Sequence, residues 1–372
     1  MSKNNKLNEA AEKVKARAVE TNNKISELGN YTYCLNNVLS IIQTQFDKIR
    51  NIPGDKHIEY DKIKKARLTW THEVETIEAN YKSSQALNIS SGAVGAATGI
   101  GVVTLAPTAA MSIATTFGVA STGTAISSLS GAAATNAALA WLGGGSLAAG
   151  GGGMAGGSAF IALSGPVGWS IAGVALLGGG ILFWLTSSDK KRLERIFSLI
   201  SDRDIKSFDL AIVELNERIT RILQETKLLN EAIVEIGSFG TDYTQMTEEQ
   251  HYTLGTYLNL MNSTTQLLVN PIMGLQPKFS EKDLEKYLSC HRVESKYLEM
   301  SVKNLLIYIA NLLFDIQIEE KDRKLLAKLY RKDKKFLEIM KVEKKDIDLS
   351  LLNIIDEVLK YKEELLKKKF QQ

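Results

Sequence analysis

The sequence predicts an all-α fold, an elongated antiparallel helical bundle or coiled coil with a glycine-rich hydrophobic region at its centre. Two observations predict it. Apolar residues recur at alternating steps of four and three near both ends of the chain, which is the heptad pattern of helices that pack along one another. Between these stretches, residues 83–188 contain no Asp, Glu, Lys or Arg. The chain therefore divides into an N-terminal arm, 1–82, an uncharged block, 83–188, and a C-terminal arm, 189–372.

The N-terminal arm is expected to begin with one long helix, whose heptad seam is interrupted only by two threonines. The seam comprises Val14, Ala18, Thr21, Ile25, Leu28, Thr32, Leu35, Leu39, Ile42, Phe46 and Ile49. The stretch NIPGDK, residues 51–56, ends this pattern because proline followed by glycine favours a turn. We expect a second helix to run from there toward Lys82, and its apolar residues are Ile58, Ile63, Leu68 and Val74.

The C-terminal arm is expected to begin with a helix from about Asp189 to Ile236, which is ended by Gly237. Such a helix measures close to 70 Å at about 1.5 Å per residue. Its seam comprises Phe208, Ile212, Leu215, Ile219, Ile222, Thr226, Leu229, Ile233 and Ile236. Seams of this kind either pack one bundle within a single chain or join several copies through coiled coils, and the pattern leaves both interpretations open.

Two sequence signals predict where later helices of the C-terminal arm begin. Thr247 is followed three residues later by Gln250, and Ser280 by Asp283. This spacing is typical of capping boxes, in which two side chains satisfy the free backbone donors of the first turn.

The uncharged block is far longer than an ordinary buried helix. A bilayer crossing needs about 20 predominantly apolar residues, and the block would supply several such lengths. It also holds 22 of the 28 glycines of the chain, including the stretch ALAWLGGGSLAAGGGGMAGG at residues 138–157. Glycine costs about 1 kcal/mol relative to alanine in a water-exposed helix, whereas small residues let helices approach closely in lipid. The block is therefore predicted to be membrane-inserting.

The best single span is GPVGWSIAGVALLGGGILFWL, residues 165–185. Its two tryptophans are expected near the two membrane interfaces, where tryptophan is enriched. The residues predicted to insert are Gly165, Trp169, Ile171, Val174, Leu177, Ile181, Phe183 and Trp184. Lys190, Lys191 and Arg192 follow directly and are predicted to form the membrane border. Basic residues on both flanks of the block favour an even number of crossings.

The sequence favours neither an enzyme nor a nucleic-acid-binding protein. The formal net charge of +3 is small for a phosphate-binding domain. Gly151, Gly153 and Gly156 match the dinucleotide fingerprint, but no strand pattern precedes them. The four histidines and two cysteines lack metal-ligand spacing. We therefore expect no catalytic residue, no cofactor, no metal and no small-molecule substrate.

The organisation of the chain resembles that of the two-state helical pore-forming toxins of the cytolysin A and haemolysin BL type, in which helical arms flank an apolar middle segment. The span at 165–185 also resembles the hydrophobic hairpin of pore-forming colicins, and the glycine-rich stretch at 138–157 is similar to segments of bacterial toxin and conflict-system proteins. The resemblance implies a soluble form that shields the apolar segment and a membrane form that inserts it. The uncharged block departs from the cytolysin type because it is much longer than that family's apolar tongue.

These patterns together favour a membrane-inserting, pore-forming or membrane-permeabilising protein, a toxin or a cell-death and defence effector. Its expected partners are a lipid bilayer and further copies of the chain, with or without companion subunits. The polar N-terminus lacks a cleavable signal peptide pattern, so the expected location is the membrane, reached from the cytoplasm or after leaderless export. The first alternative is a constitutively membrane-anchored coiled-coil scaffold or sensor. The second is a soluble helical protein that buries the block within its own fold.

Overall fold

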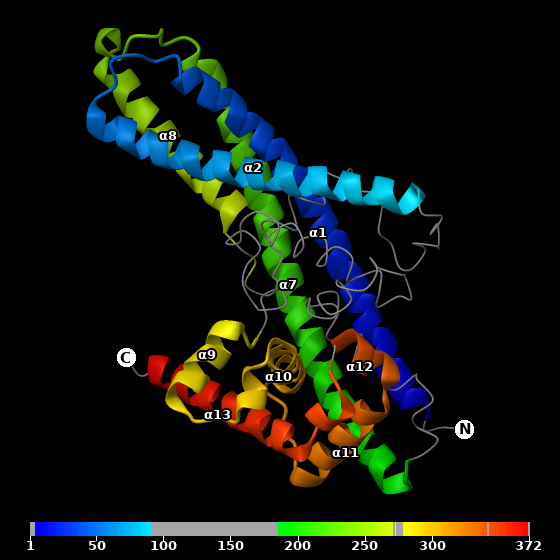
Figure 1. The fold of residues 1–372 in the computed structure, drawn as a ribbon. Helices are drawn as coiled ribbons and strands as arrows, with labels where there is room; N and C mark the ends of the chain where they lie inside the picture. The colour runs from blue at the N-terminus through cyan, green and yellow to red at the C-terminus, as the bar shows by residue number, and fades with distance from the viewer. Residues whose placement is uncertain (1–3, 91–184, 271, 273–277, 341, 371–372) are drawn as a thin grey trace.

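The computed structural model describes residues 4–90, 185–270, 272, 278–340 and 342–370, and within these ranges the chain is helical and contains no strand (Figure 1). The all-α prediction is confirmed. The α-helices are α1 (Asn4–Phe46), α2 (Gly54–Ser90), α7 (Ser187–Ile236), α8 (Glu248–Val269), α9 (Glu281–Cys290), α10 (Met300–Leu313), α11 (Glu320–Lys332), α12 (Lys334–Met340) and α13 (Leu349–Phe370), and the short 3-10 turns are η3 (Tyr243–Gln245), η5 (Ser295–Leu298) and η6 (Lys344–Asp346).

The predicted break between the first two helices is confirmed. α1 ends at Phe46 and α2 begins at Gly54, and Asn51 in the turn adopts a left-handed backbone with φ of 60°. α2 then folds back along the end of α1. The Tyr60 hydroxyl donates to the Gln43 carbonyl oxygen at 3.1 Å, and the Arg67 Nε donates to the Gln43 side chain at 2.9 Å. The first two helices therefore form an antiparallel hairpin at this end.

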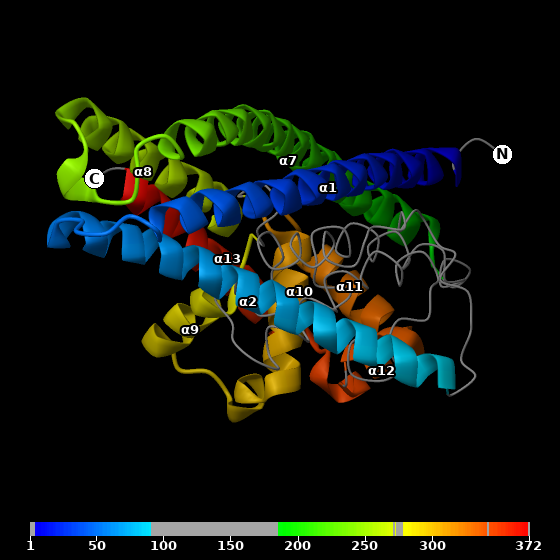
Figure 2. The same ribbon diagram turned by 90° about the horizontal axis from the view of Figure 1, so that it is seen from above.

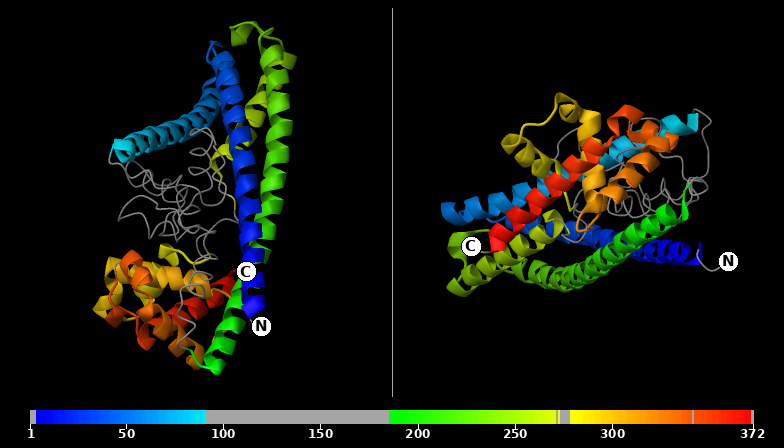
Figure 3. Two further views of the ribbon diagram at one scale, coloured as in Figure 1. Left: turned by 90° about the vertical axis from the view of Figure 1, so that its right-hand side faces the viewer. Right: turned by 90° about the horizontal axis from the view of Figure 1, so that it is seen from below.

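The two longest helices, α1 and α7, lie side by side and run in the same direction (Figures 1 and 3). Near their N-terminal halves, the Arg17 Nε lies 3.1 Å from an Asp209 carboxylate oxygen. Beyond their C-terminal ends, the Arg50 amide donates to the Thr241 carbonyl at 2.9 Å. Residues near the start of α1 thus contact the first half of α7, and the two helices end side by side, so they are parallel. The prediction of an antiparallel arrangement is wrong for this pair, because a heptad seam buries the same face in either orientation.

α7 and α8 form the second hairpin of the long part of the molecule. The Ser263 hydroxyl donates to Glu225 at 2.8 Å, and Arg218 donates to the Leu267 carbonyl at 2.9 Å, so residue numbers rise along one helix as they fall along the other. α7 ends before Gly237, as the sequence predicts. The capping box of Thr247 at the start of α8 is also confirmed.

The first hydrophobic core lies between α1, α2, α7 and α8, and we call it the bundle core. The α1 seam faces it from Leu28 onward, whereas Val14 packs with Phe208 of α7 in a separate small cluster. Thr21 and Thr32 of the seam are buried as well. The α7 seam lies on the α1 side as well: Phe208, Leu215, Ile219, Ile222, Leu229 and Ile236 are buried, and Ile212, Thr226 and Ile233 are half-buried. In this structure both seams are used within one chain.

The second core gathers α9, α10, α11, α12 and α13 around the first turns of α7, and we call this assembly the C-terminal unit (Figures 1 and 2). α10 is its centre, since every residue from Leu305 to Leu313 is buried. The predicted capping box of Ser280 is confirmed at the start of α9. α7 therefore contributes its first turns to one core and its later turns to the other, and the C-terminal arm takes part in two packed assemblies.

α2 differs from the sequence prediction in which residues form its buried face and in where the helix ends. Ile63 and Val74 are buried, but Ile58 and Leu68 are exposed. The buried face is made instead by Tyr60, Ile63, Arg67, Trp70 and Val74, at helical steps of three and four. The helix also continues to Ser90, eight residues past Lys82, which is the last charged residue before the uncharged block. No helix in the described ranges combines the length and apolar composition of a bilayer-crossing segment.

Candidate functional site

The candidate site is the beginning of α7, residues 185–203, where the uncharged block meets the C-terminal unit. We call this segment the junction. Thr186 caps the helix, and its side chain accepts a hydrogen bond from the Asp189 amide at 3.1 Å. Asp189 is the first charged residue after the block, and it lies where a negative charge favours a helix start. The sequence thus changes from uncharged to charged within the first turn of one helix.

An apolar face holds the junction against the C-terminal unit. Leu193, Ile196, Phe197 and Ile200 are buried in the second core, and Leu185 joins them from just before the helix. Burial of each such side chain contributes about 1.5 to 3 kcal/mol to the free energy of folding. The end of the uncharged block is therefore attached to a packed helical unit.

Ion pairs between α7 and α11 reinforce this attachment. Arg192 bonds to Asp322 at 2.9 Å and to Glu319 at 3.0 Å, and Arg195 bonds to the other oxygen of Asp322. The hydrogen bond to Glu319, followed in importance by the one to Asp322, raises the pKa of Arg192. The Asp322 side chain has no exposed surface, and both of its carboxylate oxygens are paired with guanidinium groups of α7. Asp322 also closes the capping box of α11 with Glu319, which fixes the carboxylate in place.

Arg203 makes a further contact one turn past the buried apolar residues. Its guanidinium donates to the carbonyl oxygens of Leu312 and Phe314 at 2.9 and 2.6 Å, at the end of α10. It also bonds to Asp204 at 2.7 Å. Burial raises the pKa of Asp204, although the neighbouring Arg203 opposes this. The last carbonyls of α10, which no longer have a partner within the helix, thus receive a charged donor from α7.

The predicted site residues fall into three groups. Those of the span, Gly165, Trp169, Ile171, Val174, Leu177, Ile181, Phe183 and Trp184, lie outside the described residues. Of the predicted border residues, Lys190 and Lys191 are exposed at the start of α7, whereas Arg192 is half-buried and bound to α11. The seam residues lie further along α7: Phe208 packs against Val14 of α1 in a small separate cluster, and the seam from Leu215 to Ile233 packs in the bundle core.

Sequence reasoning missed the part of the site that α11 supplies. The residues concerned are Asp322 and the exposed bases of the stretch EKDRKLLAKLYRK. A signal was present, because Lys321, Lys324, Lys328, Arg331 and Lys332 recur at helical spacing opposite the buried leucines. Local sequence could not show that this helix packs beside the junction.

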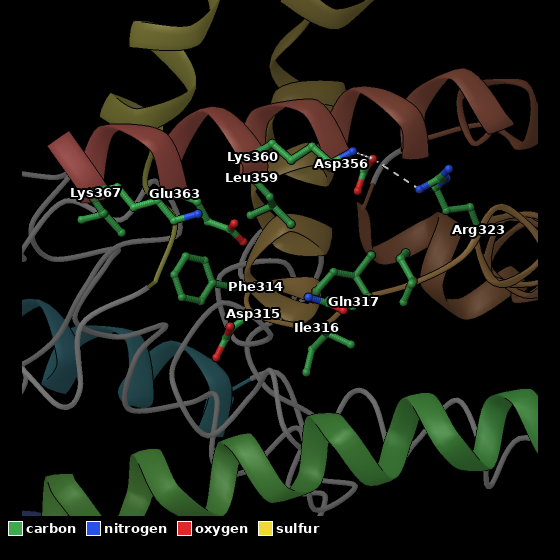
Figure 4. A pocket seen from close by; sticks show the side chains of 13 residues that line it. Phe314, Asp315, Ile316, Gln317, Arg323, Asp356, Leu359, Lys360, Glu363 and Lys367 are labelled. Carbon is green, nitrogen blue, oxygen red and sulfur yellow. Dashed lines mark hydrogen bonds and ion pairs between the residues drawn. The ribbon is translucent and has the colours of Figure 1, made fainter.

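A cavity of about 780 Å³ lies in the C-terminal unit between the loop that follows α10 and the helix α13 (Figure 4). Its apolar lining includes Phe314 and Leu359, while Asp356 pairs with Arg323 at 3.3 Å and with Lys360 at 2.8 Å. Nowhere in the described ranges do three His, Cys, Asp or Glu side chains come together as metal ligands would. The lining of the cavity therefore combines apolar side chains with ion-paired ones.

Comparison of this chain with protein families, with curated proteins and with solved structures gives no match.

Proposed function

We propose that this protein permeabilises membranes and that its uncharged block enters the bilayer while its helical assemblies stay in water. The observation that carries the proposal is that residues 83–188 contain no Asp, Glu, Lys or Arg. In the rest of the chain about one residue in three is charged. Charged side chains cost about 2.5 to 3.5 kcal/mol at the centre of an inserted helix, so a sequence free of them over this length suits hydrocarbon.

The structure of the junction, on the water-exposed side of the proposed crossing, also supports the proposal. Apolar packing and ion pairs attach the end of the block to the C-terminal unit, and Lys190 and Lys191 stay exposed just beyond it. Exposed bases that directly follow an apolar segment are typical of the end of a membrane crossing. The proposal also agrees with the organisation of two-state helical pore-forming toxins, in which helical arms flank the inserting segment.

Assembly of several copies is part of this proposal, but the α1 and α7 seams are already packed together. Copies would therefore meet through outward residues of the long helices. Leu210, Val213 and Val234 on α7 are 68%, 65% and 78% exposed and offer apolar contacts for this purpose.

We expect protein purified without detergent to release a dye trapped in lipid vesicles. The physical reason is that helices of the inserted block, which are rich in glycine, serine and threonine, would line a path through which water and small solutes cross the hydrocarbon layer. Release should rise more steeply than in proportion to protein concentration if several copies assemble. A protein that binds vesicles and leaves the trapped dye inside would contradict the proposal.

The second candidate function is a constitutively membrane-anchored scaffold or sensor. The outward apolar residues of α7 favour it, because they would serve equally well as a contact for another protein. In that case the protein would require detergent throughout purification, and vesicles reconstituted with it would remain sealed.

A further inference from the structure

The exposed face of α11 carries five bases and a single acid, Glu320, which pairs with Lys324. Lys321, Lys324, Lys328, Arg331 and Lys332 are all exposed, and their spacing places them within one side of the helix. We call these five residues the basic face. The opposite side of α11 carries Leu325, Leu326, Leu329 and Tyr330, which are buried in the second core.

Further exposed lysines surround the basic face. Lys334 of α12 and Lys344 and Lys345 of η6 belong to elements that follow α11 directly, and η6 packs against α11. Lys190 and Lys191 lie at the start of α7, next to the Arg192 that binds Asp322 of α11. Figures 1 and 3 show α11, α12 and the first turn of α7 together at one end of the molecule. The positive charge thus gathers where the uncharged block joins the helical body.

The exposed acids of this region do not neutralise it. Glu319 pairs with Arg192, Glu320 with Lys324 and Glu343 with Lys345. Among the described side chains, Lys321, Lys328 and Lys332 of the basic face take part in no ion pair. Cations without an acidic partner among the described side chains keep their attraction for an external anionic surface.

We propose that the basic face docks the C-terminal unit on the headgroups of an anionic lipid bilayer. This inference rests on the proposed function, because an inserted block would bring the junction to the membrane surface. The basic face lies beside the junction, so its charges would come within the Debye length of about 10 Å over which anionic headgroups attract bases at moderate salt. A nucleic acid fits this surface less well, since Tyr330, the one aromatic residue of α11, is fully buried and offers no ring for base stacking.

The test compares two triple variants of the full chain. The first changes Lys321→Gln, Lys328→Gln and Lys332→Gln on the basic face. The matched control changes Lys48→Gln, Lys62→Gln and Lys65→Gln, three exposed lysines at the α1–α2 end of the molecule. Both variants lose the same charge. Helical content and melting temperature should equal those of the unchanged protein in both, because all six side chains are exposed.

Binding is measured with vesicles of phosphatidylcholine alone and with vesicles that also contain phosphatidylglycerol. Each base near an anionic surface contributes about fivefold to partitioning, so we expect the first variant to bind the anionic vesicles about 100-fold more weakly than the control. Salt of about 1 M, where the Debye length is about 3 Å, should remove the difference. Vesicles of phosphatidylcholine alone should not distinguish the two variants.

The outcomes separate this inference from the proposed function. Equal binding of both variants to anionic vesicles would overturn the docking role while dye release continued. Binding that depends on the basic face without dye release would support docking and contradict permeabilisation. Salt-sensitive binding to a nucleic acid duplex through the same three lysines, with no binding to anionic vesicles, would also overturn the inference.

Discussion

Replacement of Ile219 and Ile222 with lysine is expected to separate α1 from α7 and to unfold the long part of the molecule. The two side chains are 6% and 1% exposed and belong to the bundle core. Truncation of one buried isoleucine costs about 2 to 5 kcal/mol, and a lysine adds the penalty of a charge beside apolar surface. Together they approach the whole free energy of unfolding of an ordinary domain, about 5 to 15 kcal/mol. Circular dichroism melting curves and gel-filtration elution volumes measure the effect.

The matched control for this variant places lysine at Val213 and Leu223, two exposed positions of the same helix. Exposed substitutions change stability by about 0.5 kcal/mol or less, so this protein should melt near the unchanged temperature. Because the seam is closed within one chain, the melting temperature of the unchanged protein should not depend on its concentration. An unaltered melting curve and elution volume after the Ile219→Lys and Ile222→Lys changes would show that the seam is not packed.

Val174→Asp is expected to abolish dye release from vesicles and to leave the helical assemblies folded. A carboxylate near the middle of the span raises the cost of insertion by about 2.5 to 3.5 kcal/mol, which lowers the inserted population about 100-fold. Among the described residues, the bundle core includes none from the block, and the second core includes only Leu185, at the edge of the block. The melting curve should therefore stay unchanged, and dye release measures the functional loss.

Val174→Leu is the control for this substitution, because it changes the shape of the side chain without a charge. It should release dye at the unchanged rate. If Val174→Asp also released dye at that rate, the span at 165–185 would not be the segment that enters the membrane.

The local features of the helices could be predicted from sequence, because short-range physical chemistry determines them. The turn at 51–56, the end of α7 at Gly237 and the caps at Thr247 and Ser280 all depend on residues within one helical turn of one another. The seams also depend only on periodicity. Each of these features agrees between sequence and structure.

The arrangement of the helices could not be predicted in the same way. A heptad seam does not encode the direction of its partner, and the parallel pairing of α1 with α7 depends on contacts such as Arg17 with Asp209. Arg192 shows the same limit at the candidate site. In sequence it is one of three bases after an apolar segment, and in the fold it binds a buried acid from α11. The partner lies far along the chain, so local charge patterning could not reveal it.

The central claim is that the uncharged block enters hydrocarbon, and tryptophan fluorescence tests it most directly. Three of the four tryptophans, Trp141, Trp169 and Trp184, lie in the block, while Trp70 is buried in the bundle core. With vesicles whose lipid tails carry bromine, a quencher by contact, we expect emission from the three to fall strongly. A variant with phenylalanine at those three positions should keep its Trp70 emission. Equal emission of the unchanged protein, when bound to brominated and to ordinary vesicles, would contradict the claim.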